Sequence, residues 1–168
     1  MVIAGNCSIE AQAYGGVIGV AFVKINGDTV WETSYNSPKT HKSPGVNIIL
    51  VEPFSCSRQE SRYFNTHQSS VAATELSTYL RQVRKGVIIV GVTADEPARY
   101  LTSAFPTLQL LGVDVSDVGY RGSFVFVAKK GFPAKTQLRK TLNKQEGASY
   151  QARLTVDITG IIENSLSV

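Results

Sequence analysis

The sequence is poor in the residues from which most catalytic and metal sites are built. Its 168 residues include two cysteines, two histidines, one tryptophan and one methionine. Two cysteines are too few for a metal cluster, and neither His41 nor His67 stands in a metal-binding or serine-nucleophile motif. Phosphate-binding loops are missing too, because the glycines of YGGVIGV precede strand-like residues rather than a helix. These absences argue against an enzyme.

Long apolar runs are also missing. The longest span about five or six residues, whereas a membrane-spanning helix needs roughly 20, so we expect no membrane span. The start MVIAGNCSIE has no basic stretch followed by a long apolar one, so we do not expect a signal peptide there. With 43% hydrophobic and 18% charged residues, the composition is typical of a soluble globular protein. The length predicts one domain over residues 1–168.

Basic residues outnumber acidic ones by 17 to 13, and many lie late in the chain, as in KKGFPAKTQLRKTLNK. Such a stretch can meet phosphates or anionic glycans, but a solvated basic face is the commoner cause. No aromatic-interleaved motif accompanies it, so we expect no nucleic-acid partner. Cys7 and Cys56 can form one bridge within the chain, form one between chains, or stay free, and the sequence does not choose among these.

Local patterns predict strands with a few helices. Asn26 and Gly27 separate two β-rich runs, which is typical of a tight hairpin. The stretch SSVAATELSTYLRQVRKG has apolar residues at helical spacing and predicts the clearest helix. Asp95 is expected to cap a second helical stretch, which Pro106 should break in two and Gly112 should end.

Buried strands are predicted at VNIILV, VIIVGV and SFVFVA, with a returning arm that ends at Phe64 and late strands in ARLTVDITGII. This mixture predicts an α+β fold in which two facing antiparallel β-sheets form a sandwich flanked by two or three short helices. Residues 87–128 taken alone also fit a parallel crossover.

Five blocks, in order, resemble one known family: SPGVNIILVEP, SRYFNTH, GVIIVGVTADEPARYL, LLGVDVSDVGYRGSFVFVAKKGF and SYQARLTVDITGIIEN. The chain is similar to the interleukin-like EMT inducer (ILEI) domain, also called the PANDER-like domain, over nearly its whole length. The resemblance implies two facing antiparallel sheets with helices outside, and a secreted or luminal setting.

The family includes secreted signalling proteins, a hyaluronan-handling protein and the sugar-binding stem module of a glycosyltransferase. In that stem module an acidic residue and an arginine contact the sugar, and their positions match Asp95 and Arg121. The acid and the tryptophan that follow this arginine in the family are Gly122 and Phe124 here. By size and family, the chain also resembles stand-alone galactose-binding lectins of marine invertebrates.

The leading hypothesis is therefore a secreted, non-catalytic lectin for glycans with a terminal sugar, galactose being the first candidate. Asp95 would accept and Arg121 would donate hydrogen bonds to sugar hydroxyls, with Glu96 as a further acceptor. Tyr100 or Tyr120 would stack on the sugar ring. The candidate ligands for Ca²⁺ are Asp95, Glu96 and Asp117.

Weak single sugar sites need a second copy for avidity, so a homodimer is expected, with Cys7 or Cys56 as a candidate bridge between chains. The main alternative is a secreted cytokine-like signalling protein, and another is a structural or adhesion module. Arg121 also has a purely structural interpretation, in which it pairs with Asp114 or Asp117 to hold its loop.

Overall fold

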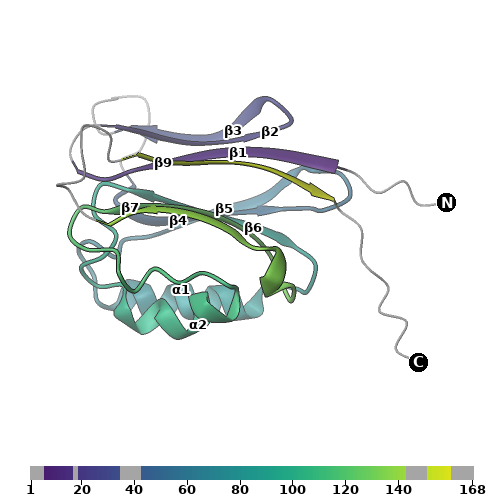
Figure 1. Ribbon diagram of the computed structural model, residues 1–168. Coiled ribbons are helices and arrows are strands. Elements are labelled where there is room, and N and C mark those ends of the chain that lie inside the picture. The colour runs from purple at the N-terminus through teal and green to yellow at the C-terminus, as the bar shows by residue number, and fades with distance from the viewer. Residues whose placement is uncertain (1–5, 17–18, 35–42, 143–150, 160–168) are drawn as a thin grey trace.

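The computed structural model describes residues 6–16, 19–34, 43–142 and 151–159, which form two antiparallel sheets and a layer of short helices (Figure 1). One sheet has four strands in the order β3-β2-β1-β9, and the other has five in the order β5-β4-β6-β7-β8. The strands are β1 (Asn6–Tyr14), β2 (Val20–Ile25), β3 (Asp28–Ser34), β4 (Gly45–Val51), β5 (Arg58–Phe64), β6 (Ile88–Ala94), β7 (Ser123–Lys129), β8 (Gln137–Thr141) and β9 (Gln151–Thr159). The helices are α1 (Val71–Gln82), η1 (Thr102–Ala104), α2 (Phe105–Leu110) and η2 (Pro133–Lys135). The expected α+β fold is confirmed.

The five-stranded sheet lies between the four-stranded sheet and the helices, so its central strands are buried on both faces (Figure 1). Along β6, Ile88 and Val90 pack toward the four-stranded sheet, whereas Ile89 packs toward the helices. Gly91 makes room for Phe126, since a Cβ there would lie 2.1 Å from the ring. Double burial explains why these strands are continuous apolar runs rather than alternating ones.

Two local predictions are confirmed by the backbone. Asn26 and Gly27 connect β2 to β3 with φ values of 49° and 87°, as a tight hairpin requires. Helix α1 buries Leu76 and Leu80 in the core beneath the five-stranded sheet and exposes Arg81 in its last turn. In the described part of the chain, no helix is long and apolar enough to cross a membrane.

The helical stretch expected to begin at Asp95 is wrong in position. Asp95 has a left-handed backbone with φ 58° and caps no helix, and helical structure begins only at Thr102. The stretch is divided into two short helices as expected, η1 and α2, and Pro106 stands in the first turn of α2, where its missing N–H has no partner to lose. Gly112 follows α2 at φ 84° and ends it as expected.

Strands β1 and β8 are not predicted by the sequence patterns used above. In β1 the small buried residues Cys7, Ala11 and Ala13 weaken an alternation that is nevertheless present. Strand β8 lies within the basic stretch and pairs with β7 at the edge of its sheet. Because β6 and β7 are antiparallel neighbours, the parallel crossover over residues 87–128 is wrong.

Cys7 in β1 and Cys56 in the turn between β4 and β5 form a disulfide, with 5.4 Å between their Cα atoms. The bond links the two sheets and uses both cysteines of the chain. The alternative of a bridge between two chains is therefore wrong. The cysteines are 49 positions apart, and closing a loop of this length stabilises the fold by about 4 kcal/mol in the chain-entropy model.

Candidate functional site

Two loops at one end of the five-stranded sheet carry most of the predicted site residues. Asp95 directly follows β6, and Arg121 lies two residues before β7 begins. Since β6 and β7 are antiparallel neighbours, the end of one lies beside the beginning of the other. The fold thus brings Asp95, Glu96, Tyr120 and Arg121 together, and we call these four residues the arginine cluster.

An ion pair and a hydrogen bond fix the guanidinium of Arg121. Its Nη1 lies 3.1 Å from Oδ1 of Asp95, and its Nε donates to the hydroxyl of Tyr120 at 2.8 Å. The bond to Tyr120 raises the pKa of Arg121 most, and the nearby Asp95 charge adds to this. The guanidinium therefore stays charged and holds Tyr120, which is 61% exposed.

Asp95 and Arg121 both adopt left-handed backbones, with φ values of 58° and 57°. Such backbones in residues other than glycine cost of order 1–3 kcal/mol and are concentrated at functional sites. The two residues that follow β1 hold them in place: Gly16 N–H donates to the Asp95 carbonyl at 2.8 Å, and a Cβ at Gly15 would lie 2.0 Å from the Arg121 carbonyl oxygen. The four-stranded sheet therefore supports the site.

Glu96 is buried beneath these loops, with 1% of the residue exposed. Its carboxylate accepts the backbone N–H groups of Ala98 and Arg99 at 3.0 Å each and that of Arg121 at 3.3 Å. The Nδ1 atom of His67 lies 3.5 Å from the same carboxylate. Glu96 thus joins three loops, and its position favours a supporting role over direct contact with a ligand.

Sequence reasoning missed His67 and only partly interpreted the glycine pair. A lone histidine in a polar context is usually a surface residue, and only the fold shows that His67 faces Glu96. The pair Gly15–Gly16, which directly follows β1, does carry a signal, because glycine next to a strand can mark close approach of another backbone. The neighbour that approaches, Arg121, lies far away in the sequence.

Tyr100 and Asp117 make other contacts. The N–H of Tyr100 donates to the carbonyl of Thr66 at 2.9 Å, and its half-buried ring lies 5.0 Å from the Arg99 guanidinium. Asp117 pairs with Lys140 at 2.7 Å, and its side chain is 51% exposed. Arg121 therefore uses Asp95 as its carboxylate partner, and the structural pairing expected with Asp114 or Asp117 is wrong.

Asp95, Glu96 and Asp117 do not converge on a metal position. Within the described ranges, no three His, Cys, Asp or Glu side chains form a group that could hold an ion. The oxygens of Glu96 already accept backbone N–H groups. The geometry therefore gives no support to the calcium part of the sequence prediction.

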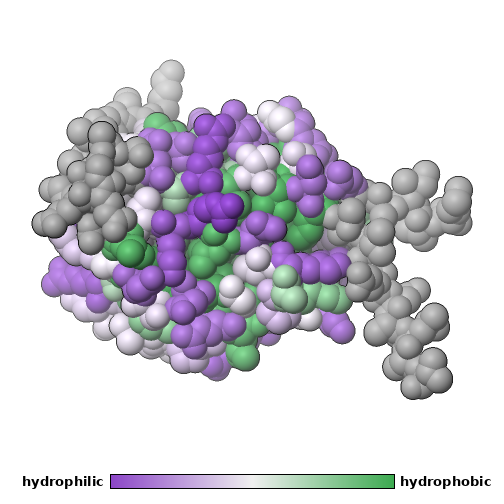
Figure 2. Space-filling view, viewed as in Figure 1, coloured by the Kyte–Doolittle hydropathy of each residue, from purple (hydrophilic) through white to green (hydrophobic). Residues whose placement is uncertain are grey.

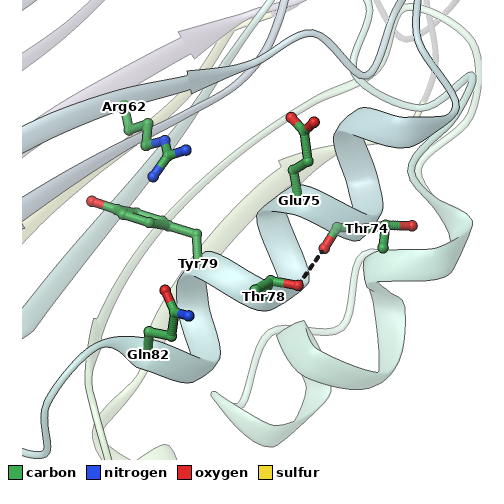
Figure 3. Close-up of a pocket in the computed structure, with 6 residues that line it drawn as sticks. All are labelled: Arg62, Thr74, Glu75, Thr78, Tyr79 and Gln82. Carbon is green, nitrogen blue, oxygen red and sulfur yellow. Dashed lines mark hydrogen bonds between the residues drawn. The ribbon is translucent and has the colours of Figure 1, made fainter.

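A separate hollow of about 200 Å³ lies between β5 and α1 (Figure 3). Figure 3 shows Arg62 reaching from the strand over the ring of Tyr79, and the guanidinium carbon lies 5.0 Å from the ring centroid. Burial raises the pKa of Tyr79 to about 12. This hollow contains no residue of the predicted site, and its contacts are those of side-chain packing.

The face seen in Figure 2 is mostly hydrophilic, with hydrophobic side chains in small groups between the polar ones. Facing sheets, outer helices, one internal disulfide and a polar cluster at a sheet end define the class, a disulfide-linked α+β sandwich. The model of the family described as interleukin-like EMT inducer matches residues 44–132, just over half of the chain. The chain belongs to this family. No curated protein sequence matches it.

Proposed function

We propose that this chain is a secreted, non-catalytic signalling protein of the cytokine-like class. The family description, an interleukin-like inducer, favours this function over a lectin. The bond between Cys7 and Cys56 supports an extracellular setting, because disulfides form and persist in secreted proteins and are rare in the cytosol.

The observation that carries the proposal is the rigid presentation of Tyr120. The ring is exposed, its hydroxyl accepts a hydrogen bond from Arg121, and Arg121 is held in turn by Asp95. Tyrosine and arginine are enriched among the residues that dominate binding energy at protein interfaces. A side chain that is already ordered loses less entropy on binding, so the arginine cluster suits a receptor contact.

Cell binding tests the proposal. Labelled protein should bind cultured cells saturably and produce a dose-dependent transcriptional response that free sugars do not inhibit. Tyr120→Ala should weaken binding by roughly tenfold or more, since truncating a central anchor costs about 2 kcal/mol. Tyr63→Ala is the matched control, because Tyr63 is 40% exposed on β5 and lies outside the arginine cluster. Folded protein without saturable binding would contradict the proposal.

A second candidate function is glycan binding at the same cluster. Sugar hydroxyls donate and accept hydrogen bonds, and the site places a carboxylate, a guanidinium and an exposed aromatic ring side by side. A glycan array tests this function, with galactose-terminated glycans as the first candidates and EDTA as the test for Ca²⁺. Binding that is lost in Arg121→Ala would favour a lectin, whereas a blank array from folded protein would reject it.

The homodimer stays a prediction and has its own measurement. Two copies would strengthen the binding of either kind of partner through avidity. Light scattering after gel filtration should then give about twice the chain mass of 18.2 kDa. Both cysteines are bonded within the chain, so this dimer should survive reduction to the extent that the fold does.

A further inference from the structure

The opposite end of the five-stranded sheet gathers positive charge. Strand pairing places Val51, Ile88 and Lys129 next to one another at this end. The backbone joins the segments further, since Gly86 N–H donates to the Lys130 carbonyl and Lys130 N–H donates to Val87, both at 2.9 Å. The end of α1 and the turn after β7 therefore form one surface. Its exposed cations are Arg81, Arg84, Lys85 and Lys135, and together with the half-buried Lys130 and the buried Lys129, which is 1% exposed, they are here called the cation patch.

Three ammonium groups of the patch surround one aromatic ring. The Nζ atoms of Lys129, Lys85 and Lys135 lie 5.1, 5.4 and 5.8 Å from the centroid of Phe132. A cation over an aromatic ring at these distances is attracted to it, although like charges gathered around one ring repel one another. A bound anion would lower that repulsion.

Lys130 has a different part in the patch. Its ammonium donates to the carbonyls of Leu80 and Arg81, at 2.5 and 3.1 Å, and so ties the end of α1 to the sheet. Burial lowers the pKa of Lys130. This contact fixes the position of the exposed cations Arg81, Arg84 and Lys85, none of which takes part in an ion pair among the described residues.

A hollow of about 230 Å³ adjoins these cations. Arg84 and Lys85 line one side of it, and Glu52, Phe54 and Gln59 line the other. Glu52 on the other side stays ionised, because hydrogen bonds from Ser55 and from the backbone N–H of Phe54 lower its pKa. An anionic group would therefore lie against the Arg84 and Lys85 side of the hollow, where a guanidinium and an ammonium can contact it.

We propose that the cation patch binds a sulfated polysaccharide, with one sulfate group in the hollow beside Arg84 and Lys85. A polyanion matches several cations that are spaced over three chain segments. A nucleic acid fits less well, because the ring of Phe132 is already surrounded by ammonium groups and the exposed Phe54 is a single ring rather than a row on which successive bases could stack. The disulfide also favours an extracellular setting, where sulfated polysaccharides occur. This site is independent of the function proposed for the arginine cluster.

Heparin binding tests the proposal on the intact protein. Wild type should bind a heparin oligosaccharide more tightly than a desulfated one, a single-stranded oligonucleotide or phosphatidylserine vesicles. Arg84→Ala/Lys85→Ala should weaken heparin binding about tenfold, the effect of losing two charge-assisted contacts. Lys24→Ala/Arg99→Ala is the control, because it removes the same net charge from β2 and from the loop after β6.

Two results would overturn the proposal. One is equal weakening in both double variants, since the binding would then follow net charge alone. The other is binding of the oligonucleotide or the vesicles as tight as that of heparin. If the alanine variant melts at a lower temperature, Arg84→Gln/Lys85→Gln replaces it, and the same loss of heparin affinity is expected.

Discussion

The two ends of the five-stranded sheet differ in how their charged side chains are paired. At the arginine cluster, Arg121 has Asp95 as a partner, and Glu96 accepts three backbone N–H groups. At the cation patch, the positive groups face an aromatic ring and helix carbonyls. At the first end each charged group has a partner of opposite charge or a hydrogen-bond donor. The second end carries an excess of positive charge.

This difference fits the two kinds of recognition proposed above. A paired, ordered cluster with an exposed ring suits a partner whose shape and hydrogen bonds match it, and salt should affect that contact little. An unbalanced patch suits a polyanion, and salt should weaken that contact strongly. The disulfide lies at the cation-patch end, since Cys56 is in the turn that follows β4.

The largest expected effect comes from the disulfide. Cys7→Ser/Cys56→Ser should lower the free energy of unfolding by about 4 kcal/mol, because the unfolded chain regains the freedom of the open loop. Urea unfolding followed by circular dichroism measures this. Hydrogen exchange should rise more around residues 52–57 than around residues 95–101, and a uniform rise along the chain would contradict the separation of the two ends.

Gly15→Ala should disturb the arginine cluster by about 1–3 kcal/mol, the usual cost of overpacking. The new methyl group would meet the Arg121 backbone, which has little room to move. Gly131→Ala serves as the comparison at the cation patch, because its φ of 87° makes alanine cost about 1–2 kcal/mol while its closest neighbour is the flexible side chain of Lys85. Both variants should therefore melt at lower temperatures, and loss of cell binding should accompany only Gly15→Ala.

Glu96→Gln should also cost about 1–3 kcal/mol, because one carboxylate oxygen becomes a donor that faces other donors. The exposed Glu75→Gln is the control and should change stability by less than about 0.5 kcal/mol. Chemical denaturation compares them. Similar free energies of unfolding for the two variants would contradict the supporting role of Glu96.

The smallest effect is a dependence on pH at Glu52. Hydrogen bonds from Ser55 lower the pKa of the Glu52 carboxyl below its ordinary value. A lowered folded pKa gives stability that is present above the unfolded pKa and is lost as the pH falls through the folded value. Glu52→Gln should therefore be slightly less stable than wild type at neutral pH, and the difference should vanish in strong acid. If the stability difference persisted in acid, it would have a cause other than the charge of Glu52.

Much of the fold is predictable because its signals are local. The Asn26–Gly27 turn, the spacing along α1 and the buried runs of β4, β6 and β7 each depend on neighbouring residues alone. The misplaced helix at Asp95 shows the limit of such signals. Asp and Pro favour helix starts, but here contacts with Gly16 and Arg121 hold Asp95 in a left-handed backbone.

The sequence by itself determined the strands other than β1 and β8, the first helix, the family resemblance and the residues Asp95 and Arg121 as candidates. Only the tertiary structure decided which groups meet: Cys7 with Cys56 across 49 positions, Arg121 with Asp95 across 26, and His67 with Glu96 across 29. The tertiary structure also placed Lys85, Lys129 and Lys135 around the ring of Phe132. Local periodicity reports which side of an element is buried, but pairings over such separations depend on how the sheets and loops pack together.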